Sequence, residues 1–287
     1  MFRFGLPVGF LVGLPVGVLA GLAFTLAAVL TPNTAQASKC FAYVEQVPEF
    51  QPSPSSAPGF IPAAFSAAQL APSVQITYVT HSTFRLETPE GVVIATDYAG
   101  FAGAGVVPTV VTMNHAHETH YTAFPDPAIR HVLRGWNPQG GPAKHNLTVE
   151  DVLIRNVPTD IRRWDGGAER DGNSIFIFEV ADLCIGHLGH LHHKPTPEQL
   201  AMIGRLDVVF APVDGSYTLD LPTMIELLKE LRASLVIPMH SFSDSSLRLF
   251  LAGMLSDFEL DMAKDATIEI SLTTLPRQPT VLVLPGR

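Results

Sequence analysis

Seven of the chain's eleven histidines gather in two short stretches. The first stretch follows an apolar run at residues 106–113 and contains His115, His117 and His120. The second contains His187, His190, His192 and His193. Imidazole is the commonest metal-binding side chain, and a buried strand that ends in closely spaced histidines is typical of a metal site. The two stretches therefore predict a metal centre at strand ends. The alternative is that these residues are surface or core histidines that bind no metal.

The elements that must position these histidines follow from hydrophobic spacing and turn residues. Short strands are expected at residues 75–78, 84–87, 92–96, 106–113, 129–133, 152–156, 174–179 and 183–187. Helices are expected at residues 196–203, 221–231 and 245–255, and further strands at 207–211, 235–237, 266–272 and 280–284. Asp220 stands where it can cap the second helix. Strands first, then strand-helix alternation, predict a sheet layer covered by helices.

The two ends of the chain differ in composition. Residues 1–37 contain one charge, Arg3, and an apolar run that ends in Ala35-Gln36-Ala37. This pattern predicts a signal peptide and an exported protein, periplasmic or secreted, while an uncleaved membrane anchor is the alternative. Residues 38–73 are rich in Pro, Ser and Ala and are expected to form a linker. Residues 74–287 then make one folded domain.

The net charge limits the classes of partner that are expected, and the cysteines bear on the cellular compartment. The formal net charge is −9 and no run of Lys or Arg occurs, so nucleic acid is not expected as a partner. A small-molecule substrate is expected instead, and a membrane only if the N-terminal segment is not cleaved. Cys40 and Cys184 could pair in an oxidising compartment. Because Cys184 lies in an apolar run and Cys40 precedes a flexible stretch, a buried free thiol at Cys184 is the expectation.

Seven separated motifs carry a family resemblance. They are residues 80–88 (THSTFRLET), 94–97 (IATD), 115–120 (HAHETH), 166–178 (GGAERDGNSIFIF), 187–191 (HLGHL), 212–218 (PVDGSYT) and 237–240 (IPMH). In this order they resemble the metallo-β-lactamase superfamily, most closely the branch of metal-dependent hydrolases that includes ascorbate-6-phosphate lactonase.

The resemblance implies a fold, a chemistry and a set of site residues. The fold is an αββα sandwich with the site at the sheet edge, where one or two ions activate water for attack on an ester, lactone, amide or phosphodiester. His115 and His117 correspond to ligands of the first metal, and His120 and His240 to ligands of the second. Asp97 would orient them from behind. His120 and Asp97 are therefore the expected catalytic residues.

Departures from the family pattern change the expected metal site. Thr119 stands in place of an Asp ligand, His190 replaces the Asp that bridges two ions, and a further family histidine before residue 166 has no counterpart. Losing anionic ligands disfavours two closely spaced dications. One ion is therefore expected. Zinc is the expected metal, and iron, copper, nickel and manganese are alternatives. The remaining candidate ligands, all or some of which would bind it, are His115, His117, His120, His190 and His240. Asp160 or Asp165 could replace the missing ligand.

Three functions remain open from the sequence. The leading prediction is an exported metal-dependent hydrolase that acts on a small ester, lactone or phosphoester. The alternatives are a metal-binding protein without hydrolytic activity and a domain that has lost its metal. His192 and His193 are expected to be solvated loop residues. His81 is expected either near the cleft or in a structural hydrogen bond.

Overall fold

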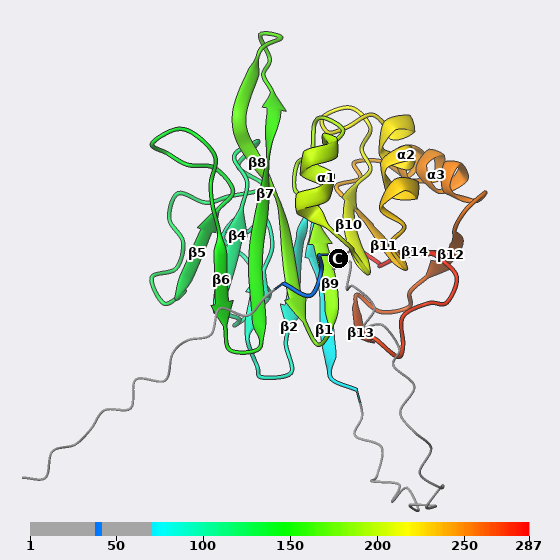
Figure 1. Ribbon diagram of the computed structural model, residues 1–287, viewed down its shortest axis with the longest axis horizontal. Helices are drawn as coiled ribbons and strands as arrows, with labels where there is room; N and C mark the ends of the chain where they lie inside the picture. The colour runs from blue at the N-terminus through cyan, green and yellow to red at the C-terminus, as the bar shows by residue number, and fades with distance from the viewer. Residues whose placement is uncertain (1–37, 42–70, 287) are drawn as a thin grey trace, which may run out of the picture. The chain divides into compact units, whose positions relative to one another are not determined.

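The computed structural model describes residues 38–41 and 71–286, which form a two-sheet sandwich (Figure 1). The expected signal peptide and most of the expected linker lie outside the described residues. The first sheet has the strand order β13-β1-β2-β3-β4-β5. Its strands are β1 (Ser73–Thr80), β2 (Thr83–Glu87), β3 (Val93–Ala95), β4 (Val110–Met113), β5 (His131–Arg134) and β13 (Thr267–Ser271).

The second sheet has the order β12-β14-β11-β10-β9-β8-β7-β6. Its strands are β6 (Asn146–Val149), β7 (Val152–Arg162), β8 (Ala168–Val180), β9 (Leu183–His187), β10 (Val208–Pro212), β11 (Leu235–Met239), β12 (Glu259–Met262) and β14 (Thr280–Val283). β7 and β8 form a long antiparallel hairpin that extends past the neighbouring strands (Figure 1). β9, β10 and β11 pair in parallel.

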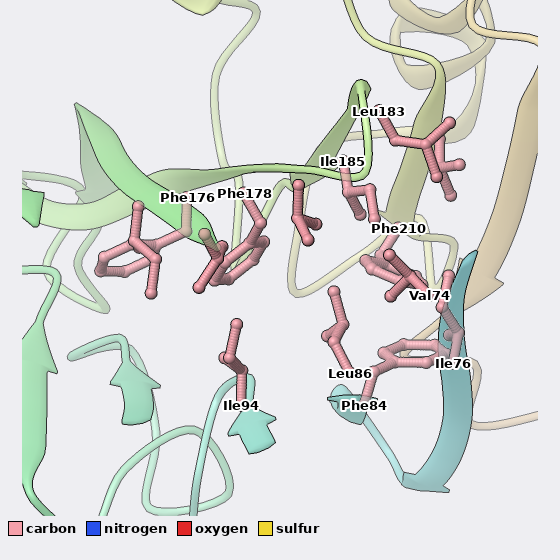
Figure 2. Packing of buried hydrophobic residues seen from close by; sticks show 14 of the residues in the cluster. Val74, Ile76, Phe84, Leu86, Ile94, Phe176, Phe178, Leu183, Ile185 and Phe210 are labelled. Carbon is pink, nitrogen blue, oxygen red and sulfur yellow. The ribbon is translucent and has the colours of Figure 1, made fainter. Parts of the chain in front are cut away.

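The main hydrophobic core lies between the two sheets. Alternating residues of β2 point inward, so Phe84 and Leu86 are fully buried, as a period of two residues requires for a strand with one buried face. From the other sheet Phe176, Phe178 and Phe210 meet them (Figure 2). The rings of Phe84 and Phe210 stack with their centroids 4.2 Å apart. The apolar residues of both sheets thereby fix how the sheets face each other.

Three helices cover the outer face of the eight-stranded sheet: α1 (Pro197–Ile203), α2 (Leu221–Leu231) and α3 (Asp244–Met254). Thr196, Asp220 and Ser243 cap their N-termini through side-chain oxygens, which satisfies backbone N–H groups that a helix leaves free. The predicted cap at Asp220 is confirmed. No helix within the described residues is long and apolar enough to cross a membrane.

The predicted fold class is confirmed, with one difference in its layers. Within residues 71–286, no helix covers the outer face of the six-stranded sheet. Loop residues Tyr98, Ala102 and Ile129 pack there instead. Two strands were not predicted, β6 and β12; all four residues of β12 are exposed, so it carries no apolar pattern. β4 begins at Val110, after Pro108, which cannot donate to a strand ladder.

The predicted free thiol is wrong, because Cys40 and Cys184 form a disulfide. The short described segment 38–41 packs against the edge of β8 and β9. Lys39 N–H donates to Glu179 Oε2 at 2.9 Å, and Arg205 N–H donates to the Cys40 carbonyl at 2.8 Å. These contacts bring Cys40 into the core beside Cys184. A pairing across 144 residues leaves no local pattern in the sequence.

Candidate metal centre

The candidate site lies at one edge of the sandwich, where several strands end. Because β9, β10 and β11 are parallel, their carboxyl ends share that edge. The loops after them carry His190, Asp214 and His240, and the loop after β4 carries His120. The turn between β1 and β2 brings His81 to the same place, where its carbonyl accepts from His240 N–H at 3.0 Å. Side chains from both sheets therefore converge.

Three imidazoles form the tightest group at this edge. His81, His120 and His240 each offer one ring nitrogen, and these atoms all lie within 4.8 Å of one another. All three Nε2 atoms are buried without a hydrogen-bond partner within residues 38–41 and 71–286. Such an atom costs about 1–3 kcal/mol unless something satisfies it. Because imidazole nitrogen is a ligand of zinc, copper, iron and nickel, these residues fit a transition-metal ion.

A carboxylate stands behind two of the three imidazoles. Asp97 Oδ2 lies 2.6 Å from His120 Nδ1, and Asp214 Oδ1 lies 3.0 Å from His240 Nδ1. A carboxylate that accepts a hydrogen bond from Nδ1–H keeps the ring proton on Nδ1, which leaves the Nε2 lone pair free for an ion and fixes the ring orientation. The sequence placed Asp97 behind the ligands, and it lies there. Asp214 belongs to the 212–218 motif, but nothing in that motif predicted its position behind His240.

Both carboxylates are held in their charged form. Burial by itself would raise the pKa of Asp97, but the charge and hydrogen bond of His120 outweigh it and lower the pKa. Burial is opposed in the same way at Asp214, where hydrogen bonds from His240 and Thr218 hold the pKa well below its ordinary value. The two negative charges lie where they offset the charge of a cation among the imidazoles.

Three imidazoles around the site have pKa values that are shifted toward the neutral form. Burial, with the like charges of His240 and His120, lowers the pKa of His81 to about 3. Burial also lowers the pKa of His117 and of His190. A metal binds imidazole only in its unprotonated form, so the lowered pKa of His81 leaves this ring free to bind a metal at neutral pH.

His190 completes the wall of the site. Its ring meets His120 and His240 edge-on, with centroids 4.7 and 4.8 Å away, and its buried Nε2 has no partner among the described residues. Its Nδ1 lies 2.6 Å from His192 Nε2. The expectation that His192 is a solvated loop residue is wrong, because this ring is 7% exposed and fills the space between His190 and Arg162.

The two histidines expected at a first metal lie away from this group. His117 is half-buried at the rim, with its ring centroid 6.5 Å from that of His120. His115 turns outward: its Nδ1 lies 2.6 Å from Glu169 Oε1 and its ring stacks on Trp136. In the part of the chain that the structure describes, neither joins the converging ring nitrogens. Their role as ligands stays a prediction.

The other positions raised by the sequence lie outside the group as well. Thr119 is exposed. Asp160 accepts from the backbone N–H of Asp171 at 2.9 Å, and Asp165 lies on the exposed β7–β8 turn. His81 belongs to the converging group, although the sequence did not predict it as a ligand. Its motif does not indicate where its ring points. The result is a nitrogen-rich site backed by two carboxylates.

Comparisons with known proteins identify the family and the fold. Residues 75–240 match the family described as the beta-lactamase superfamily domain. A solved structure from Thermotoga maritima, a candidate Zn-dependent hydrolase of the metallo-beta-lactamase superfamily, is 28% identical, with a TM-score of 0.55 over 75% of this chain and 100% of that one. A candidate metal-dependent hydrolase from Parabacteroides distasonis shares the fold at 15% identity and a TM-score of 0.52, over 64% of this chain and 89% of that one.

A third similar structure shows the same fold with a different chemistry. It is CmlA, a diiron beta-hydroxylase from Streptomyces venezuelae, with 11% identity and a TM-score of 0.50, covering 70% of this chain and 54% of that one. No curated protein shows significant sequence similarity to this chain. The family match extends from β1 to His240 and includes the metal centre. The chain therefore belongs to the metallo-β-lactamase superfamily.

Proposed function

We propose that the protein is a metal-dependent hydrolase that holds a single zinc ion and acts on a small ester, lactone or phosphoester. The observation that carries this proposal is the convergence of His81, His120 and His240 with three buried, partnerless Nε2 atoms. A nitrogen-only ligand set also suits other first-row metals, but zinc commonly takes three imidazoles and leaves a further position open. The relative from Thermotoga maritima supports the same metal.

The chain's own residues divide the work. His81, His120 and His240 would hold the ion, while Asp97 and Asp214 orient two of the rings. When bound, zinc supplies a Lewis acid and brings the pKa of a coordinated water toward neutrality. The substrate would approach along a cleft beside His117, which is lined by Arg162, Arg163, Trp164, His192, Ser216 and Tyr217. Two arginines and two aromatic rings favour a small substrate that carries negative charge.

The test measures metal and turnover in the same preparations. Protein purified without an affinity tag is loaded with zinc, and its metal content and its hydrolysis of lactones, esters and phosphodiesters are measured. We expect about one zinc per chain and turnover of at least one substrate class. His240→Ala should lose both, whereas His131→Ala, which replaces a histidine of β5, should keep both. Zinc binding without any hydrolysis would contradict the proposal.

A metal-binding protein without hydrolytic activity is the second candidate. The observation that favours it is that the carboxylates beside the imidazoles, Asp97 and Asp214, are engaged behind the rings, while position 119 offers an exposed threonine. Within the described residues the site then has no free carboxylate to act as a base. Under this alternative, native protein binds zinc without turnover, and the double change Thr119→Asp with His190→Asp is needed to create hydrolysis.

We also propose that the protein is exported. The Cys40–Cys184 disulfide supports this location, because such bonds persist in oxidising compartments and are rare in the cytosol. Intact-mass analysis of protein recovered from the periplasm or medium should show a chain cleaved after Ala37. A full-length chain confined to the cytosol, with both thiols reduced, would contradict this.

A further inference from the structure

A chain of hydrogen-bonding groups runs from the β7–β8 hairpin into the metal centre. The backbone N–H and the Nε–H of Arg162 both point at His192 Nδ1, at 3.0 and 3.3 Å. The other ring nitrogen of His192, Nε2, lies 2.6 Å from His190 Nδ1. Arg162 is itself anchored, because its Nη2 donates to the carbonyls of Ser216 and Thr218 at 3.0 and 2.7 Å. The start of the chain is therefore fixed.

The direction of each hydrogen bond follows from what each group can do. A backbone N–H only donates, and arginine has no acceptor atom. His192 Nδ1 must therefore accept, which places the proton of this neutral ring on Nε2. That N–H donates to His190 Nδ1, so His190 in turn carries its own proton on Nε2. The nitrogen of His190 that faces the site is an N–H group and has no free lone pair.

The rings of the metal-binding group have the opposite arrangement. The Nδ1 atoms of His120 and His240 face carboxylates, which accept a hydrogen bond from Nδ1–H and leave Nε2 free to bind a metal. His190 has another imidazole in that place. For His190 to bind an ion through Nε2, both ring nitrogens of His192 would have to accept hydrogen bonds, whereas a neutral imidazole has one acceptor nitrogen and one N–H. The same site thus holds imidazoles in two different tautomers.

We infer that His190 enters the metal centre as a hydrogen-bond donor and not as a ligand, and that it holds an anionic oxygen of the bound substrate. Its N–H is buried among the rings of His117, His120 and His240, whose centroids lie 4.7 to 4.8 Å away. The oxygen it would hold is a phosphoryl oxygen, or the carbonyl oxygen of an ester or lactone as it gains negative charge during attack by water. This second part rests on the proposed function; the tautomer does not.

Nitrogen-15 NMR tests the tautomer directly. Two-bond proton–nitrogen spectra of labelled protein, metal-free and zinc-loaded, report which ring nitrogen of each histidine carries the proton, and His190→Gln identifies the signals of His190. We expect the Nε2–H form at His190 and the Nδ1–H form at His120 and His240. His192→Glu puts a carboxylate behind His190 and should move its proton to Nδ1. An Nδ1–H form of His190 in zinc-loaded wild type overturns the inference.

Metal content separates a donor from a ligand. His190→Ala and His190→Gln should keep the zinc stoichiometry of the wild type, whereas His120→Ala should lose it. Circular dichroism confirms that each variant is folded. A folded His190→Ala protein that loses its zinc contradicts the inference while leaving the proposed hydrolase intact. Conversely, a wild type that binds zinc but hydrolyses nothing contradicts the proposed function and leaves the tautomer standing.

Inorganic phosphate tests the anion-binding role. In zinc-loaded protein, His190→Ala should weaken phosphate binding in calorimetry by about tenfold or more, since a hydrogen bond to a charged group is lost. His190→Gln keeps an N–H and should recover part of the affinity. Equal behaviour of wild type and His190→Ala toward phosphate, including absence of binding in both, contradicts the anion-binding role.

Discussion

At the residue scale, the group behind each imidazole decides what its outer nitrogen can do. His120 and His240 are backed by carboxylates and present lone pairs, whereas His190 is backed by His192 and presents a proton. His81 also belongs to this group, and its backbone φ is +47°. Residues other than glycine adopt this conformation at a cost in free energy. The carboxylates come from other segments of the chain, and the proton on His190 depends on Arg162, which lies 30 residues before His192.

Asp214 offers a test of this role. Asp214→Asn removes the charge that orients His240 and should weaken zinc binding by about 10- to 100-fold, as loss of the partner behind a metal ligand does. Competition with a chromogenic chelator measures the affinity. Asp165→Asn is the control, because that carboxylate lies on the exposed β7–β8 turn and its loss should leave zinc affinity unchanged. Equal effects of the two changes would count against the assignment.

At the element scale, tight loops at strand ends bring the site residues together. The loop after β9 reverses direction at Gly189, whose φ is +59°. A Cβ at this position would lie 2.4 Å from Asn114 Nδ2 and 2.5 Å from Asn173 Oδ1. Asn114 also donates to Asp97 at 2.8 Å. The glycine therefore allows the loop that carries His190 to pack directly on the residues that hold Asp97.

Replacement of this glycine should be costly for a reason that a matched control isolates. Gly189→Ala adds both backbone strain and a clash with two buried amides, so we expect a loss of roughly 2–4 kcal/mol in the free energy of unfolding. Gly140→Ala also has a positive φ, but nothing lies within 4 Å of its new Cβ, and it should cost only about 1 kcal/mol. Urea unfolding measures both, and similar losses would exclude the close packing as the cause.

At the scale of the whole molecule, hydrophobic packing and a disulfide stabilise the folded unit. The phenylalanine core joins the two sheets, and the disulfide ties segment 38–41 to β9. Cys184 is fully buried on the helix-covered face of the eight-stranded sheet, where Cys40 packs beside it. The N-terminal part of the folded unit thus depends on a covalent bond as well as on packing.

Loss of the disulfide should lower stability by about 2–5 kcal/mol, because it closes a long loop in the unfolded chain. The double change Cys40→Ser with Cys184→Ser is compared with wild type in urea, with and without dithiothreitol. Reductant should destabilise the wild type and leave the double variant unchanged. A wild type that is insensitive to reductant while its thiols are shown to be free would contradict the prediction.

The metal-free protein should lose stability as the pH falls from about 6.5 toward 3. In the fold, burial lowers the pKa of His81 and that of His192 to about 3. The unfolded chain takes up protons at these rings near pH 6.5 and the folded chain does not, so protons favour unfolding in this window. Denaturation in EDTA at several pH values measures the slope. The double change His81→Asn with His192→Asn should make it shallower, and an unchanged slope would argue against the shifts.

Local patterns in the sequence predict most of the strands, the three helices and the order of the metal-site motifs, although β6 and β12 were not predicted. Hydrophobic spacing is a local property of the chain. The strand that contains Phe84 and Leu86 and the helix cap at Asp220 are therefore predicted from the sequence. The ligand loop at residues 115–120 was recognised in the same way. The spacing of its histidines does not predict which of the rings point into the site.

Tertiary contacts bring particular histidines together, and these contacts also set which ring nitrogen of each histidine carries the proton. The tertiary structure brought His81 beside His240, turned His115 toward Glu169, and paired Cys40 with Cys184. It also placed the backbone N–H of Arg162 against His192, which sets the proton on His190. Each of these outcomes depends on contacts between segments distant in the chain, and such contacts arise from packing of the two sheets and not from any local pattern of residues.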